Sequence, residues 1–402
     1  MSGTRADARD RVSGRVRALK PSETLALSAR ARELRARGER VVSFAAGEPD
    51  FDTPAHVQEA AVEAIHQGHT RYTEVGGTAA LREAIARKLS VENGLSYGPK
   101  QIVVSNGAKH SIWNALFTLL EPGDEVLCPV PYWVSFPEIV RLVGGVPVPV
   151  PPRPGTLKVT PAEVERAITP RTRLLILNSP NNPSGAVYRR EEIEALAELT
   201  LRHDLHVLSD EIYETLVYGD VEHVSIASLG PQLLDRTVVV NGVSKTWAMT
   251  GWRLGYAAAA REVAEAMERL QGQMTSNPSS VSQQAALRAL TGDRGPALDM
   301  RERFAARRDL IVERVSRLQG VRLAAPDGAF YVFPDFSERI RAARNGVTDS
   351  VSLCDYLIDE AQIVCVPGSA FGMEGHLRLS YAISERDITE GMNRLEEALR
   401  GL

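Results

Sequence analysis

Between residues 101 and 259, short apolar segments rich in β-branched residues alternate with longer segments of helical periodicity. This alternation is typical of β-α units and predicts a mostly parallel sheet. Residues 174–177 are apolar without interruption, so helices should cover both faces of the sheet. The pattern therefore predicts the α/β class with a buried central sheet. The predicted strands are 101–105, 125–129, 173–178, 206–209, 237–241 and 254–259.

The pattern changes near residue 300, where a long Arg-rich helix is followed by short strands and a closing helix. We predict a large domain at 48–298, a small α+β domain at 299–402, and an N-terminal segment at 1–47 that joins the small domain. We interpret the proline cluster at 147–154 as a surface crossing between elements. The other predicted elements are helices at 108–120, 191–202, 261–271, 278–290, 299–318 and 385–399, and strands at 330–333, 363–366 and 377–381.

Charge, apolar segments and cysteine content together argue against several classes of protein. The 402 residues carry 51 acidic and 47 basic side chains, interspersed along the chain, so we expect no nucleic-acid binding. No segment is apolar for 18 residues and residues 1–17 are polar, which predicts no membrane span or secretory signal and a cytoplasmic protein. Three cysteines without a Cys-x-x-Cys pair disfavour a disulfide framework.

Lys245 lies in a run of small residues, Gly242 to Gly255, that also contains Arg253. A lysine that holds an aldehyde cofactor needs small neighbours, and a fixed cation nearby favours both a phosphate and an unprotonated amine. Only six of the 47 basic residues are lysines, so lysine is used sparingly. The run predicts a covalent role for Lys245; a solvated loop lysine is the alternative.

Asp210 and Tyr213 follow an apolar strand, at the sheet edge where ligands bind in such folds. A carboxylate beside a pyridine nitrogen raises the pKa of that nitrogen and keeps the ring cationic. We assign this role to Asp210, and to Tyr213 a hydrogen bond to the phenolic oxygen of the ring. A helix N-cap and a core aromatic are the respective alternatives.

The segment with Gly107, Ala108 and Lys109 joins a strand to a helix, so free N–H groups converge there on any bound anion. We predict that it forms half of a phosphate cup. Arg253 would close the cup, with a weaker contribution from Ser244. Such junctions also occur without a ligand, so this one gains weight only from its neighbours.

Three further side chains are candidates for ring or substrate contacts. Asn182 lies in a two-proline turn after a buried strand and could reach the phenolic oxygen. Trp133 could stack on a flat ring or belong to the core. Arg378 lies in an apolar strand, where an unpaired charge is costly, so we predict that it binds a substrate carboxylate; a structural ion pair is the alternative. No metal-ligand spacing, nucleophile elbow or Walker sequence is found.

Together these residues make the chain resemble a class I aminotransferase of fold type I, in the prokaryotic branch of the aspartate aminotransferases. The resemblance runs from about residue 12 to the end. It implies pyridoxal 5'-phosphate as cofactor, ping-pong transfer between an amino acid and a 2-oxo acid, and a homodimer. The motifs that carry it are residues 46–51, 179–185, 210–213, 244–253 and 378–380.

The resemblance also implies residue roles. The cofactor would be held by Lys245, Asp210, Tyr213, Asn182, Arg253 and the amides of Gly107, Ala108 and Lys109; the residues themselves add Ser244 and Trp133 as candidates. The substrate would meet Arg378, which holds its α-carboxylate, together with Asn182, Gly47, Trp133 and Lys109. Tyr72 would reach the phosphate in the neighbouring subunit.

One departure from the family bears on the substrate. Animal-type and enterobacterial members bind the distal carboxylate with an arginine whose place here is Gly272. Lys109, with Ser22 and Thr24, is an alternative pocket for the distal carboxylate. Such a pocket favours aspartate and 2-oxoglutarate as substrates. Prephenate or aromatic amino acids, C–S β-lysis on the same fold, and a catalytically silent cofactor binder are the other interpretations.

Overall fold

The computed structural model describes residues 12–19 and 23–402. Within these residues a seven-stranded sheet forms the centre, in the order β2-β8-β7-β6-β5-β3-β4. All neighbouring strands are parallel except the two pairs made by β8. The predicted α/β fold with a mostly parallel sheet is confirmed. The strands are β2 (Ile102–Ser105), β3 (Glu125–Pro129), β4 (Val146–Val150), β5 (Thr172–Asn178), β6 (His206–Asp210), β7 (Thr237–Gly242) and β8 (Gly255–Ala258).

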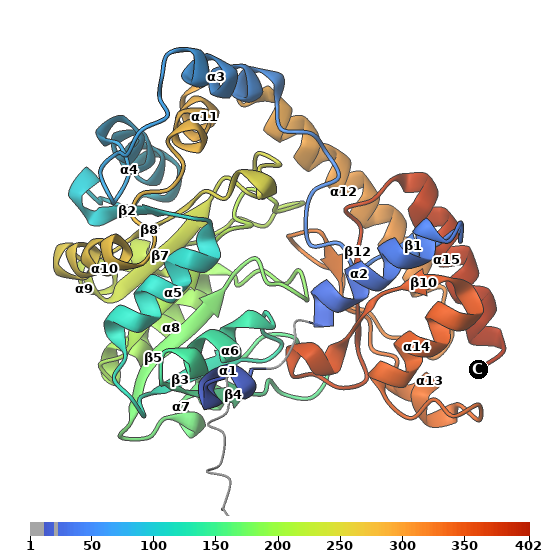
Figure 1. Ribbon diagram of the computed structural model, residues 1–402. Coiled ribbons are helices and arrows are strands. Elements are labelled where there is room, and N and C mark those ends of the chain that lie inside the picture. Colours follow the sequence, from blue (N-terminus) through green and yellow to red (C-terminus); the bar gives the residue numbers. More distant parts are fainter. Residues whose placement is uncertain (1–11, 20–22) are drawn as a thin grey trace, which may run out of the picture.

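Helices cover both faces of this sheet (Figure 1). In β5, Leu174 and Ile176 belong to one apolar cluster and Leu175 and Leu177 to another. Successive side chains of a strand point to opposite faces, so both faces of the uninterrupted apolar run are buried. The helices of this part are α3 (Ala55–His66), α4 (Ala79–Asn93), α5 (Ala108–Leu119), α6 (Ser135–Leu142), α7 (Pro161–Ala167), α8 (Arg190–Arg202), α9 (Pro231–Arg236), α10 (Arg261–Met274) and α11 (Ser280–Thr291).

The proline cluster was interpreted as a surface crossing, which is wrong for residues 147–150, because they lie in a strand, whereas residues 151–154 form a loop. Pro147 and Pro149 lie within β4, which pairs in parallel with β3 alone. Proline cannot donate a backbone hydrogen bond, and an edge strand needs only one side of its backbone for pairing. Alternating prolines therefore fit an edge strand at this place.

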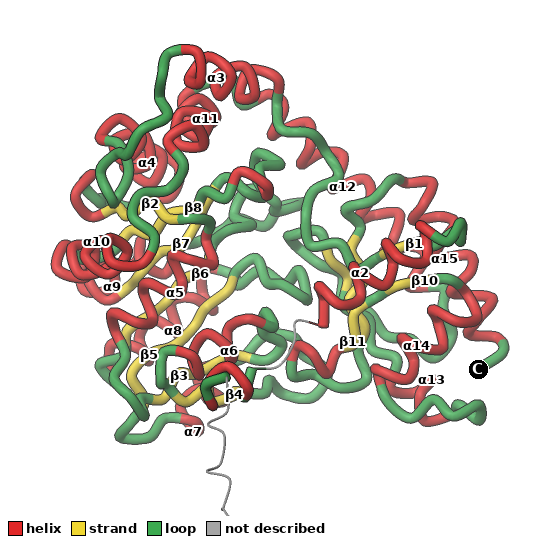
Figure 2. The backbone as a smooth tube through the Cα atoms, viewed as in Figure 1, coloured by secondary structure: helices red, strands yellow, loops and turns green. Residues whose placement is uncertain are grey.

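The C-terminal part contains two small sheets, which Figure 2 shows apart from the central sheet. One sheet has the order β11-β12-β9 and the other pairs β1 with β10. The strand predicted at 363–366 is thus divided between two sheets. The elements are β9 (Tyr331–Val332), β10 (Ile363–Val364), β11 (Val366–Pro367), β12 (Leu377–Ser380), α12 (Gly295–Ser316), α13 (Ser337–Ala342), α14 (Ser350–Ala361) and α15 (Glu385–Arg400).

The N-terminal segment contains α1 (Gly14–Arg17), α2 (Glu23–Ala36) and β1 (Val42–Ser43). Helix α2 and strand β1 pack against this C-terminal part, whereas Figure 1 draws α1 away from it, near the labels of α6 and β4. β1 runs parallel to β10, and the N–H of Phe44 donates to the carbonyl of Val364 at 2.7 Å. The exact domain boundaries stay a prediction. Among the described helices, none has the length and apolar character needed to cross a membrane.

Candidate active site

A cavity of about 600 Å³ opens where β5 and β6 end and the loop after β7 begins. The structure brings most of the predicted site residues together around it. Gly107 and Tyr72 do not line it. The predicted residues that do are Gly47, Ala108, Lys109, Trp133, Asn182, Asp210, Tyr213, Ser244, Lys245, Arg253 and Arg378.

Lys245 follows β7 and points into the cavity, where its Nζ donates to the carbonyl of Gly47 at 2.6 Å. Burial lowers the pKa of Lys245 to about 8. Glu48 opposes this shift, whereas Arg378 and Arg253 add to it. The amine is therefore far more available as a nucleophile near neutral pH than an exposed lysine is.

Asp210 is the last residue of β6 and is buried. Its pKa is raised to about 7, mainly by burial; the charge of Glu211 adds to the shift, whereas the N–H of Ile212, at 3.3 Å, and the charge of Lys245 oppose it. A carboxyl group with this pKa is only partly ionised at neutral pH, and a cation bound beside it would make the ionised form predominant. Asp210 would therefore favour a protonated nitrogen in a pyridine ring bound beside it.

Asn178, which the sequence analysis did not single out, fixes the turn that carries Asn182. Its Nδ2 donates to the carbonyl of Asp210 at 3.0 Å, and its Oδ1 accepts from the N–H of Asn182 at 2.9 Å. One side chain thereby joins the ends of β5 and β6. An asparagine at the end of a buried strand, directly before a proline turn, was an available signal.

Arg378 is 2% exposed, and its guanidinium is held in place by neutral acceptors. Nη1 donates to Oδ1 of Asn182 at 3.1 Å and Nη2 to the carbonyl of Ala45 at 2.9 Å, while Nε has no partner. Tyr331 lies below it, with its ring centre at 4.5 Å. No acidic side chain of the described residues forms an ion pair with it, so the alternative of a structural ion pair finds no partner.

Tyr331 is a second residue that the sequence analysis missed. Its hydroxyl lies 2.9 Å from the hydroxyl of Tyr213, and it comes from β9 in the C-terminal part. Burial raises the pKa of Tyr213 well above its usual value, so this hydroxyl stays a donor. Nothing in the sequence around Tyr331 distinguishes it from a core aromatic.

The start of α5 and Arg253 form a cradle for an anion. The amides of Ala108 and Lys109 open the helix and have no acceptor within it. Gly107 has a φ of 86°, and a Cβ there would lie 2.5 Å from Nη2 of Arg253. A Cβ on Gly255 in β8 would lie 2.2 Å from the amide nitrogen of Ala108. Two glycines therefore allow the strand, the helix end and the guanidinium to meet.

The predicted stacking and distal-pocket residues are also placed. Nζ of Lys109 lies 4.7 Å from the ring centre of Trp133. Burial, and then the charge of Arg253, lower the pKa of Lys109. Ser22 and the side chain of Thr24 lie outside the described residues, so their part in the pocket stays a prediction. Tyr72 is 90% exposed and away from the cavity of its own chain.

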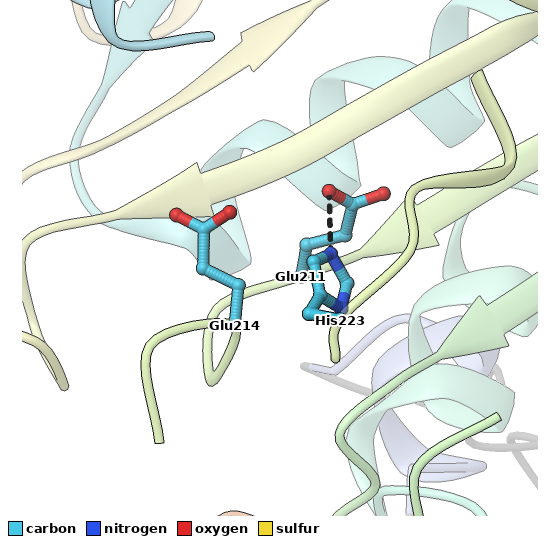
Figure 3. Close-up of side chains that lie close together, drawn as sticks. All are labelled: Glu211, Glu214 and His223. Carbon is cyan, nitrogen blue, oxygen red and sulfur yellow. Dashed lines mark hydrogen bonds and ion pairs between the residues drawn. The ribbon is translucent and has the colours of Figure 1, made fainter. Parts of the chain in front are cut away.

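Glu211, the next residue after Asp210 in the chain, forms a cluster with Glu214 and His223, and the ligand atoms of the three lie within 4.8 Å of one another (Figure 3). One carboxylate oxygen of Glu211 accepts from two serine hydroxyls and the other lies 3.2 Å from Nε2 of His223. The ammonium of Lys88 contacts Glu214. We interpret this cluster as a charge network that already contains its cation, and not as a metal centre.

A profile of the family described as Aminotransferase class I and II matches residues 39–395. The chain belongs to this family. It is 45% identical over 386 residues to the aspartate aminotransferase of Geobacillus stearothermophilus, covering 96% of this chain and 98% of that protein. It is 46% identical over 389 residues to the aspartate/prephenate aminotransferase of Cereibacter sphaeroides, covering 96% and 97%. The protein is a transaminase.

Solved structures of aminotransferases share the fold. The aspartate aminotransferase from Thermus thermophilus with maleate superposes with a TM-score of 0.91 at 45% identity, over 96% of this chain and 99% of that chain. The aspartate aminotransferase from Rhizobium meliloti gives 0.93 at 42% identity, over 97% and 99%. This aminotransferase therefore has the predicted fold type I.

Proposed function

We propose that this enzyme transfers an amino group between L-aspartate and 2-oxoglutarate by a ping-pong mechanism, with pyridoxal 5'-phosphate as cofactor. The observation that carries the proposal is one cavity that holds both Lys245, with its pKa near 8, and the buried Arg378 without an acidic partner. A reactive amine beside a carboxylate site is what an amino-acid enzyme of this kind requires. The names of the relatives support aspartate as substrate.

The residues of the cavity fit the cofactor. The start of α5 and Arg253 would hold the phosphate, and the lack of a Cβ on Gly107 leaves room for the Arg253 guanidinium at this place. Asp210 would face the pyridine nitrogen, and Tyr213 and Asn182 the phenolic oxygen. When bound, the cofactor supplies an electron sink that stabilises negative charge at the substrate Cα.

The chain contributes orientation and proton transfer. Arg378 would fix the α-carboxylate, and so the direction of the bond that breaks at Cα. Once the substrate amine has displaced Lys245, Nζ of Lys245 would take the proton from the substrate Cα and return it at the cofactor carbon. A pKa near 8 suits both tasks, because both forms of the side chain are then populated near neutral pH. The uncharged amine can take the proton, and the ammonium can return it.

We also propose that two copies share their sites. Tyr72 is 90% exposed in the single chain, which fits a side chain that serves the phosphate of a partner subunit. Lys109, with Ser22 and Thr24, would support a distal carboxylate. The name of the Cereibacter relative favours prephenate as a second substrate.

An absorbance scan of the purified holoenzyme tests the proposal. We expect L-aspartate to abolish the band of the lysine-bound cofactor and 2-oxoglutarate to restore it. A response to L-alanine or L-phenylalanine but not to L-aspartate would keep the enzyme class and refute the substrate. Pyruvate and ammonia from cystathionine without an oxo acid would favour a C–S β-lyase. A Lys109→Ala variant with unchanged aspartate kcat/KM would remove Lys109 from the pocket.

A further inference from the structure

The cavity holds more positive charge than its proposed ligands explain. Among the described residues that line it, six are basic and two, Glu48 and Asp210, are acidic. Like charges in a shared cavity repel one another unless anions lie between them. The phosphate and the α-carboxylate account for part of the excess. The basic residues are Arg32, Arg35, Lys109, Lys245, Arg253 and Arg378.

Three arginines of α2 differ in what their guanidinium groups contact. Arg30 forms ion pairs with two aspartates of α14, at 3.2 and 3.6 Å. Arg35 donates from Nε and Nη2 to the carbonyl of Val41, at 3.3 and 3.2 Å. Arg32 lines the cavity and is exposed, and no ion pair or hydrogen bond joins it to any other described side chain. Of the three, it is the cation available to a ligand.

Arg32 and Lys109 reach the cavity from different walls. α2 packs against β10 and β11 in the C-terminal part, on the right in Figure 1, whereas Lys109 lies in the first turn of α5, beside the central sheet. Nζ of Lys109 lies over Trp133, and the charge of Arg253 acts on it, so Lys109 and Arg253 contribute positive charge to the same wall. An anion between the walls would meet cations from both.

We infer that Arg32 binds the distal carboxylate of dicarboxylic substrates. Arg378 anchors the α-carboxylate from the same C-terminal part, and a guanidinium can take a carboxylate through two parallel hydrogen bonds. The substrate class is then the dicarboxylic amino and oxo acids, as opposed to monocarboxylic ones. This inference rests on the proposed function, since it assigns a role within that same site.

The test compares Arg32→Gln, Arg32→Lys and a matched control, Arg30→Gln, which removes a charge from the same helix on the side facing α14. Maleate is titrated into each holoenzyme and its Kd is read from the absorbance of the bound cofactor. We expect the Kd of maleate and the KM of aspartate to rise about tenfold in Arg32→Gln, with kcat within about twofold. Arg32→Lys should fall between, and Arg30→Gln should match the wild type.

Selectivity gives a second measurement, the ratio of kcat/KM for L-aspartate to that for L-alanine. We expect this ratio to fall about tenfold in Arg32→Gln. Equal maleate affinities of Arg32→Gln and Arg30→Gln would overturn the inference. If the wild type did not react with aspartate but bound maleate more tightly than Arg32→Gln does, the proposed substrate would be refuted. The role of Arg32 in binding a distal carboxylate would then be retained.

Discussion

At the residue scale, charges of both signs decide when Lys245 can react. Burial is the largest cause of its lowered pKa, and Glu48 opposes that shift. We predict that Glu48→Gln moves the pKa of Lys245 below about 8, because the carboxylate no longer stabilises the ammonium. Only the uncharged amine attacks the aldehyde, so the rate of cofactor attachment to apo-protein rises with pH, and its midpoint should shift to lower pH.

A control separates charge from local structure. Oε2 of Glu48 accepts from the hydroxyl of Thr250 at 2.6 Å. Thr250→Val breaks this hydrogen bond but keeps the carboxylate, so its midpoint should stay near that of the wild type. The same downward shift in both variants would show that charge is not the cause.

The sequence predicted the site residues that lie in or directly after strands. It did not predict the site residues that reach the cavity only through contacts between distant parts of the chain. Lys245, Asp210 and Arg378 each follow or lie in an apolar strand, so their chemistry showed in local context. Tyr331 meets Tyr213 only because the two parts of the chain come together. The assigned roles of all these residues stay predictions until variants are measured.

At the scale of elements, the start of α5 depends on a residue without a side chain. We predict that Gly107→Ala weakens cofactor binding at least about tenfold, because its Cβ would displace the Arg253 guanidinium and its φ of 86° disfavours alanine. Equilibrium dialysis against pyridoxal 5'-phosphate measures this affinity. Gly123→Ala is the matched control, since Gly123 has a φ of 95° but no atoms within 4 Å of the new Cβ. Equal losses in both would attribute the effect to backbone strain alone.

The contact between α4 and the turn after β6 is a buried ion pair. Lys88 and Glu214 are 8% and 6% exposed. We predict that Lys88→Met lowers the free energy of unfolding by about 3–5 kcal/mol, because it leaves a buried carboxylate without its cation. Urea unfolding measures this, and adding Glu214→Gln should recover most of the loss.

An exposed pair provides the contrast. Arg202 and Glu165 are 56% and 48% exposed, so Arg202→Met should cost at most about 1 kcal/mol. If Lys88→Met cost no more than Arg202→Met, burial would not set the strength of these pairs.

Element prediction succeeded where periodicity and burial agree. The strands of the central sheet from β2 to β8 were expected from their apolar runs, except β4, whose prolines suggested a loop. Periodicity also could not show that β10 and β11 belong to different sheets, because that division depends on partners far along the chain. Local pattern therefore gives elements more reliably than it gives their pairing.

At the scale of the whole molecule, shared sites predict that two defective chains can complement each other. A Lys245→Ala chain and a Tyr72→Ala chain would form a hybrid in which one site has both residues intact. Random pairing should then restore about a quarter of the wild-type activity, since half of the dimers are hybrids with one working site. Activity after mixing and reassociation is the measurement. If Tyr72 served the site of its own chain, mixing would restore nothing.

The pairing of β1 with β10 joins the beginning of the described chain almost to its end. Val42 lies opposite Ile363, with most of the protein between them. During translation the central sheet has all its strands once residue 258 has left the ribosome, whereas β1 must wait for residues 363 and 364. This segment is made before the central sheet and is nevertheless fixed after it. Until then Phe44, buried in the finished protein, remains a hydrophobic side chain that a chaperone could bind.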